Sequence, residues 1–146
     1  MNENDILSRM VRDHCKIEKL LTKLDEDSKG EYLEMVKTFH LFEWELEKHI
    51  FVEEKAIFTL YAPEDVSEGY KMLPNLTKQH NVILNNLNNW RDDIKNKRIP
   101  RDIFSFKEYL IKHKNYEENE VYPRLDESMT EDQKKYIFNK IDQIIV

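Results

Sequence analysis

Two segments of the sequence carry the same arrangement of metal-binding side chains. His49 opens the segment HIFVEEKAIF, and His113 opens the segment HKNYEENEVY. In each, a glutamate follows the histidine by four residues, a second glutamate comes next, and an aliphatic and an aromatic residue end the segment. Residues four apart lie on one face of an α-helix, so the imidazole nitrogen and the carboxylate oxygen can reach the same metal ion. The repeated pair therefore indicates a metal site built on helices.

The composition of the chain favours an all-α fold. The 146 residues include only two glycines and four prolines, while 40% are hydrophobic and 36% are charged. A β-sandwich or barrel needs many more turns. We predict helices over about 5–27, 31–60, 70–97 and 102–121, with Pro74 in the first turn of the third and Pro123 ending the fourth. A capping box at Thr130 predicts a short fifth helix over about 130–145.

Each of the four long helices is expected to bury a seam of apolar residues at spacings of three and four. Every seam is interrupted by a histidine, and two are also interrupted by a glutamate. The seams around His14 and His80 match at the same offsets, which suggests a weak internal repeat. We predict a single domain over 1–146, with an up-down-up-down four-helix bundle over about 5–125. In such a bundle, residues equidistant from a turn lie at one height. Six polar side chains then share one layer: His14, His49, Glu53, His80, His113 and Glu117.

A buried layer with two carboxylates needs compensating charge, because an unpaired buried carboxylate costs several kcal/mol. Two cations would remove that cost, with Glu53 and Glu117 bridging them and the four imidazoles as terminal ligands. This nitrogen and oxygen donor set suits iron, with manganese or zinc as alternatives. Buried His–Glu hydrogen bonds without metal are the competing interpretation. A ferritin-like site is excluded because it needs Glu-x-x-His. The residues three before the five histidines are Val11, Lys37, Leu46, Thr77 and Leu110.

With these residues identified, the chain resembles the hemerythrin-like family, also called the HHE cation-binding domain. The resemblance rests on RDHCKIEKLL, HIFVEEKAIF, KQHNVILNNL and HKNYEENEVYP, and it covers about residues 5–125. It implies a four-helix bundle with two non-haem iron ions, for which we expect an oxo or hydroxo bridge. Members of the family bind oxygen, respond to oxygen or nitric oxide, handle iron, or take part in the repair of damaged iron centres.

The sequence departs from the oxygen-carrying hemerythrins at one point. Those proteins have five histidine ligands, with His-x-x-x-His on the third helix, whereas Leu76 and Leu84 flank His80 here at that spacing. We interpret His40 as a surface histidine because it is out of phase with His49. The resulting hypothesis is a nearly symmetric site. His14 and His49 hold one metal, His80 and His113 hold the other, and Glu53 and Glu117 bridge the two.

Two carboxylates and two tyrosines near the predicted layer each have two alternative roles. Glu18 and Glu45 could complete a coordination sphere, although the interpretation as surface or outer carboxylates is favoured. Tyr116 and Tyr122 could donate hydrogen bonds, but packing in the core is the favoured interpretation. We expect an apolar ligand pocket lined by Phe39, Phe42, Leu76 and Phe106.

The function that we expect is binding of, or response to, a small ligand (O2, NO or peroxide) at a di-iron centre, or iron handling under stress. The alternatives are an oxidase or peroxidase enzyme, and a metal-free interaction module that uses Ile137, Ile141 and Ile144. The net charge of −6 argues against nucleic-acid binding. No apolar run approaches the roughly 20 residues that span a bilayer, and no signal peptide is apparent. The single cysteine suits a reducing cytoplasm. A redox partner or iron-acceptor protein is expected, and the oligomeric state stays open.

Overall fold

The computed structural model describes residues 5–60 and 66–145, and every element within them is helical, as predicted. Four long helices are formed by α1 (Ile6–Asp27), α2 (Tyr32–Val52), α3 (Val66–Lys95) and α4 (Ile103–Tyr116). A π-helical turn, η1 (Glu53–Ile57), and a 3-10 turn, η2 (Phe58–Leu60), extend α2. A second π-helical turn, η3 (Glu117–Val121), joins α4 to α5 (Tyr122–Ser128), and α6 (Glu131–Ile145) follows.

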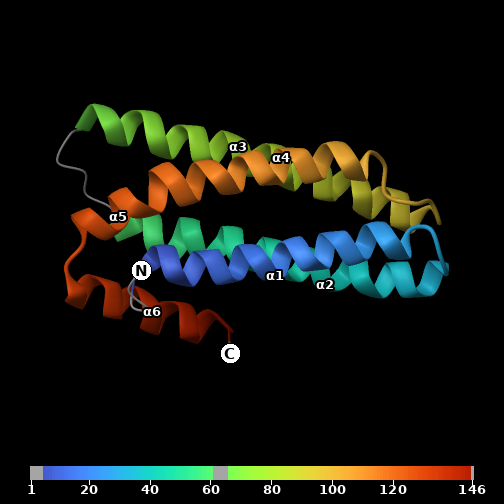
Figure 1. Ribbon diagram of the computed structural model, residues 1–146, viewed down its shortest axis with the longest axis horizontal. Helices are drawn as coiled ribbons and strands as arrows, with labels where there is room; N and C mark the ends of the chain where they lie inside the picture. Colours follow the sequence, from blue (N-terminus) through green and yellow to red (C-terminus); the bar gives the residue numbers. More distant parts are fainter. Residues whose placement is uncertain (1–4, 61–65, 146) are drawn as a thin grey trace.

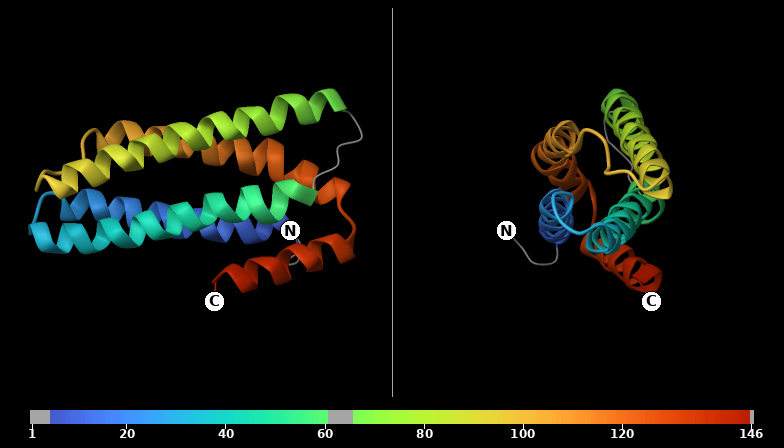
Figure 2. Two further views of the ribbon diagram at one scale, coloured as in Figure 1. Left: turned by 180° about the vertical axis from the view of Figure 1, so that it is seen from behind. Right: turned by 90° about the vertical axis from the view of Figure 1, so that its right-hand side faces the viewer.

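The four long helices lie side by side along the long axis of the molecule (Figure 1). In the end view of Figure 2 they occupy four corners, with α1 beside both α2 and α4, and α3 completing the set. The last helix, α6, folds back outside them and contacts η1. Thr130 and Gln133 exchange the two hydrogen bonds of the predicted capping box at the start of α6.

Two hydrophobic cores lie inside the molecule, and the polar layer separates them. The first core is formed by the ends of the long helices near the α1–α2 and α3–α4 connections; its largest side chains include Phe39, Phe42, Trp90 and Phe106. The second core joins the start of α1, the end of α2, α5 and α6. Ile137 and Ile141 of α6 are buried in this second core. That face of α6 therefore packs on its own chain, which corrects the idea that it is free for a partner.

Two of the expected helix boundaries were wrong. Helix α3 begins at Val66, so Pro74 lies inside it and not in its first turn. Residues 66–69, which were expected in the connection between the second and third helices, therefore belong to α3, and residues 61–65 lie outside the described part of the chain. Pro123 does not end the fourth helix either, because the chain continues as α5 to Ser128. The turn η3 has already interrupted the α-helical bonding, and Pro123 then stands in the first turn of α5, where a missing N–H is tolerated.

The start of α1 is fixed by a side chain from the other end of the chain. Asp126 of α5 accepts hydrogen bonds from the backbone N–H groups of Ile6, at 2.7 Å, and Leu7, at 3.1 Å. Asp5, the residue before α1, makes no such bond with its own side chain. The buried ammonium group of Lys134 lies 3.0 Å from Asp5 and 3.6 Å from Asp126. These interactions connect α1, α5 and α6 on the side of the polar layer that holds the second core.

We expect Asp126→Ala to lower the free energy of unfolding by about 1–2 kcal/mol, because two N–H groups at the start of α1 lose their acceptor. Glu127→Ala is the matched control, since it removes a neighbouring carboxylate that is exposed. Urea unfolding of both metal-free variants measures the difference. Equal midpoints for the two variants would contradict the proposed capping role.

Candidate metal centre

The structure brings all six predicted residues into the layer between the two cores, and all six are buried. The histidines come from the four long helices, one from each, and each glutamate is the first residue of a π-helical turn. The six are His14 on α1, His49 on α2, Glu53 at the start of η1, His80 on α3, His113 on α4 and Glu117 at the start of η3.

Glu117 stands between two groups of donor atoms. Its Oε1 atom lies 3.1 Å from His14 Nε2 and 3.1 Å from His113 Nε2. On one side, His14 Nε2 is also 3.1 Å from His49 Nε2. His14, His49 and Glu117 therefore offer one set of ligand atoms that all lie within 4.8 Å of one another.

Glu53 also faces both pairs of histidines. Its Oε1 atom lies 2.9 Å from His49 Nε2 and 3.6 Å from His80 Nε2. Together with His113 and Glu117, Glu53 and His80 form the second set of ligand atoms within 4.8 Å. Each carboxylate thus contacts one histidine of each pair, which is the arrangement that two bridging ligands require.

The donor atoms fit a pair of cations better than they fit one another. His80 Nε2, His113 Nε2, Glu53 Oε1 and both carboxylate oxygens of Glu117 are buried and have no hydrogen-bond partner among the described residues. Leaving a buried polar atom unpaired costs about 1–3 kcal/mol, and more for a charged group. Cations in the layer would satisfy these atoms. Imidazole nitrogen with carboxylate oxygen is a donor set that suits iron, manganese or zinc.

The second glutamate of each repeated segment orients a histidine on another helix. His80 Nδ1 donates to Glu54 Oε1 at 3.0 Å, and His14 Nδ1 donates to Glu118 Oε2 at 2.7 Å. Such bonds fix the ring so that Nε2 points to the metal position, and they raise the basicity of the ligand. In the sequence, Glu54 and Glu118 stand one residue past Glu53 and Glu117, so a regular α-helix would turn them about 100° away from the layer. The repeated Glu-Glu pair was the available signal.

The outer nitrogens of the other two histidines also face oxygen atoms. His113 Nδ1 is hydrogen-bonded to Gln79 Oε1 from α3. His49 Nδ1 lies 3.5 Å from Asp13 Oδ2 on α1. All four imidazoles thus direct Nε2 inward and face an oxygen outward, as metal-binding histidines do.

Without metal, the layer holds protons. Burial lowers the pKa of His80, but the nearby carboxylates of Glu117, Glu53 and Glu54 outweigh it and raise the pKa to about 10. Burial likewise lowers the pKa of His49, yet the charge of Glu53 and the nearby Asp13 raise it well above its usual range. Burial raises the pKa of Glu117, whereas the neighbouring Glu53, His113 and His14 hold it well below the usual range. A metal must therefore displace protons from imidazolium groups.

The residues whose ligand role was left open lie outside both donor sets. Glu18 pairs with Lys114 at 2.7 Å. Glu45 pairs with Lys16 at 3.0 Å and with Lys48 at 2.9 Å. His40 is exposed, and its Nδ1 lies 3.5 Å from Glu43. The structure gives Glu18 and Glu45 lysine partners, in agreement with the favoured interpretation of both as surface or outer carboxylates.

Tyr122 is a member of the layer whose position the helical period did not reveal. Its hydroxyl donates to Glu53 Oε2 at 3.1 Å and lies 3.2 Å from His14 Nε2. The π-helical turn η3 places it there, since the backbone N–H of Tyr122 bonds to the carbonyl of Glu117, five residues back. The turn η1 does the same for Phe58 and Glu53.

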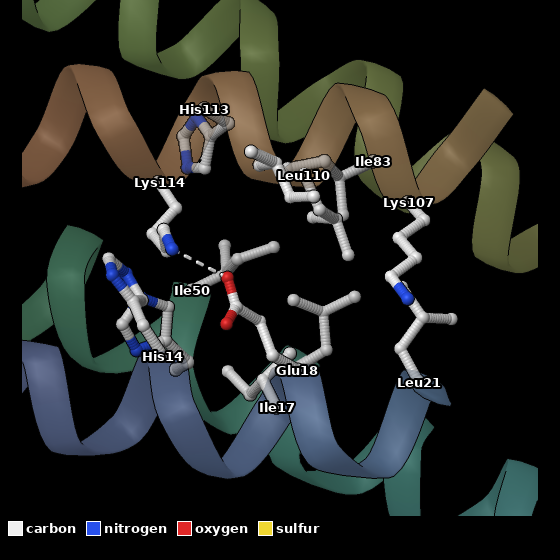
Figure 3. Close-up of a pocket in the computed structure, with 13 residues that line it drawn as sticks. His14, Ile17, Glu18, Leu21, Ile50, Ile83, Lys107, Leu110, His113 and Lys114 are labelled. Atoms are coloured by element: carbon white, nitrogen blue, oxygen red, sulfur yellow. Dashed lines mark hydrogen bonds and ion pairs between the residues drawn. The ribbon is translucent and has the colours of Figure 1, made fainter. Parts of the chain in front are cut away.

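A small apolar pocket opens between α1 and α4 and reaches three of the histidines (Figure 3). Its volume of about 40 Å³ exceeds the roughly 10–15 Å³ that one water-sized ligand needs. The expected lining was wrong, because this pocket is lined by none of the four residues Phe39, Phe42, Leu76 and Phe106. The lining comes mainly from Ile17, Leu21, Leu46, Ile50, Ile83 and Leu110. His14 and His113 lie at one end with the Glu18–Lys114 pair beside them, and His49 also lines the pocket.

These observations describe an all-helical protein with a buried His/Glu site that could hold cations. The family model of the hemerythrin HHE cation binding domain matches residues 5–125, so the chain belongs to this family. Comparison with curated proteins and with solved structures gave no match. Within residues 5–60 and 66–145, no helix combines the length and the apolar character needed to cross a bilayer.

Proposed function

We propose that this protein binds two non-haem iron ions in the polar layer and uses them to engage a small ligand, namely O2, NO or peroxide, or to handle iron under stress. The observation that carries the proposal is the position of Glu117, whose Oε1 atom faces one histidine from each pair at 3.1 Å. His14 and His49 would hold one ion and His80 and His113 the other, with Glu53 and Glu117 shared. Bound iron supplies a redox-active centre with positions for an exchangeable ligand.

The surrounding residues have three tasks in this proposal. The outer acceptors, Glu54 and Glu118 among them, hold the imidazoles in the orientation that points Nε2 inward. The apolar lining of the pocket limits water beside His14, His49 and His113 while leaving room for a small molecule. The two cores on either side of the layer keep the helices at a fixed spacing.

The proposal extends to the setting of the site. The four long helices form an up-down-up-down bundle with α6 as a short fifth helix, in one domain over 1–146. The protein works in the cytoplasm, where its one cysteine, the exposed Cys15, stays reduced. A redox partner or an iron-acceptor protein exchanges electrons or metal with it.

Metal analysis with absorption spectroscopy tests the proposal, on protein purified without oxygen and then exposed to air. We expect about two irons per chain and new near-ultraviolet and visible bands on oxidation. One metal or none in a folded protein would contradict it. A stable reversible adduct with O2 would indicate oxygen carriage, and slow bleaching would favour a role in response to oxygen, NO or peroxide. Catalytic turnover of peroxide that is lost in Glu53→Ala would favour the enzyme alternative.

A further inference from the structure

The hydroxyl oxygen of Tyr122 lies among the donor atoms of the candidate site. The side chain is fully buried. Its oxygen is 3.2 Å from His14 Nε2, a donor of the first set, and 3.1 Å from Glu53 Oε2. Iron accepts oxygen ligands such as phenolate as well as nitrogen ligands such as imidazole.

The spacing of this oxygen matches the spacing of the other donors. Two ligand atoms that bind one ion at about 2.1 Å and at right angles lie about 3.0 Å apart. His14 Nε2 is 3.1 Å from His49 Nε2 and 3.1 Å from Glu117 Oε1. The contacts of Tyr122 at 3.1 and 3.2 Å have nearly the same length. Its oxygen therefore stands where a neighbouring ligand of the same ion would stand.

Only one of the two repeated His-x-x-x-Glu segments ends in a residue with a hydroxyl oxygen. Phe58 ends the first repeated segment as Tyr122 ends the second, and each follows its π-helical turn directly. The ring of Phe58 stacks against His80, with centroids 6.4 Å apart and planes 12° apart. The ring of Tyr122 lies against His14 in the corresponding place, with centroids 5.7 Å apart. At this position the two halves of the site differ by one hydroxyl group.

We propose that Tyr122 is a further ligand of the metal that His14 and His49 hold, bound through its phenolate oxygen. Coordination replaces the O–H bond with an O–metal bond, and the proton leaves to solvent. The site is then asymmetric, and more exchangeable positions remain on the ion beside His80, His113 and Phe58. This inference rests on the proposed di-iron function, but it can fail while that function holds.

Resonance Raman spectroscopy of the air-oxidised, iron-loaded protein tests the assignment. A phenolate bound to iron(III) gives a visible charge-transfer band, and excitation in that band enhances the ring vibrations of tyrosine. Tyr122→Phe should remove the band and these vibrations while about two irons per chain remain. Tyr116→Phe is the matched control. It deletes a hydroxyl one residue before Glu117, and Tyr116 interacts with Asn75 outside the donor sets, so its spectrum should equal that of the unaltered protein.

A second measurement covers the case in which Tyr122→Phe does not load iron. Unaltered protein made with ring-deuterated tyrosine should show isotope shifts in the enhanced vibrations. Two irons per chain with no tyrosine vibrations would overturn the ligand assignment, and Tyr122 would then only donate its hydrogen bond to Glu53. A folded chain with no iron would instead contradict the proposed function, and with it this inference.

Discussion

Glu117→Gln should abolish tight binding of both metal ions. Glu117 is the one residue that belongs to both sets of ligand atoms found in the described residues. Glutamine keeps the volume of the side chain but removes the negative charge that faces His14 and His113 at 3.1 Å. We expect metal affinity to fall by more than the roughly 100-fold that marks the upper range for an outer hydrogen-bond partner. Equilibrium competition with a metal chelator measures the affinity.

Glu118→Gln is the matched control, because it makes the same chemical change one residue further along. Glu118 contacts His14 Nδ1 from outside the layer. Its loss should weaken binding by about 10–100-fold while leaving two ions per chain at saturating metal. If Glu117→Gln and Glu118→Gln bound metal equally well, the assignment of Glu117 as the shared ligand would be wrong.

Metal removal should reverse the dependence of stability on pH. In the metal-free protein the pKa of His80 is raised from 6.5 to about 10, so the folded state favours the protonated ring. The resulting stabilisation is complete below pH 6.5 and is lost as the pH rises through about 10. The free energy of unfolding of metal-free protein should therefore fall over this range. The metal-loaded protein needs neutral imidazoles, so its stability should instead fall as the pH drops and protons compete with metal.

Urea unfolding of chelated and loaded protein across this pH range measures the two slopes. Calorimetric titration in two buffers of different ionisation enthalpy should in addition show proton release on metal binding. His80→Gln should reduce the slope of the metal-free protein, and the raised pKa of His49 should account for the part that remains. His40→Gln should leave the slope unchanged, since His40 is exposed and lies nine residues before His49 on α2, roughly 13 Å along the helix axis. Parallel slopes for the loaded and metal-free forms would contradict the exchange of protons for metal.

The apolar period predicted the helices and the six layer residues because α-helical phase depends only on residue number. Residues that depend on a change of phase were not predictable in this way. Nine residues of α-helix turn the chain by about 900°, which would place Tyr122 on the face opposite His113. The turn η3 changes that phase. The role of Asp126 at the start of α1 was also hidden, because it joins residues from opposite ends of the sequence.

The lining of the pocket is a second feature that the apolar period of the sequence did not predict. The expected lining was chosen from large apolar residues on the seams, but the phenylalanines pack into the first core. The space that remains lies where branched side chains such as Ile17 and Leu110 meet beside Lys107 and Lys114. Periodicity identifies which residues face inward. The volumes of the side chains decide where the interior stays open.

The π-helical turns let the chain on either side of the layer follow separate helical phases. Each turn holds one residue more than an α-helical turn, so it behaves as a one-residue insertion, after Glu53 in η1 and after Glu117 in η3. Deleting one residue from η3 would restore α-helix and rotate everything beyond it by about 100°. Tyr122 and Leu125 would then leave the second core, although the histidines would keep their places. An insertion or deletion in η1 or η3 must therefore preserve the rotation of the following helix about its axis, as well as fit the space available.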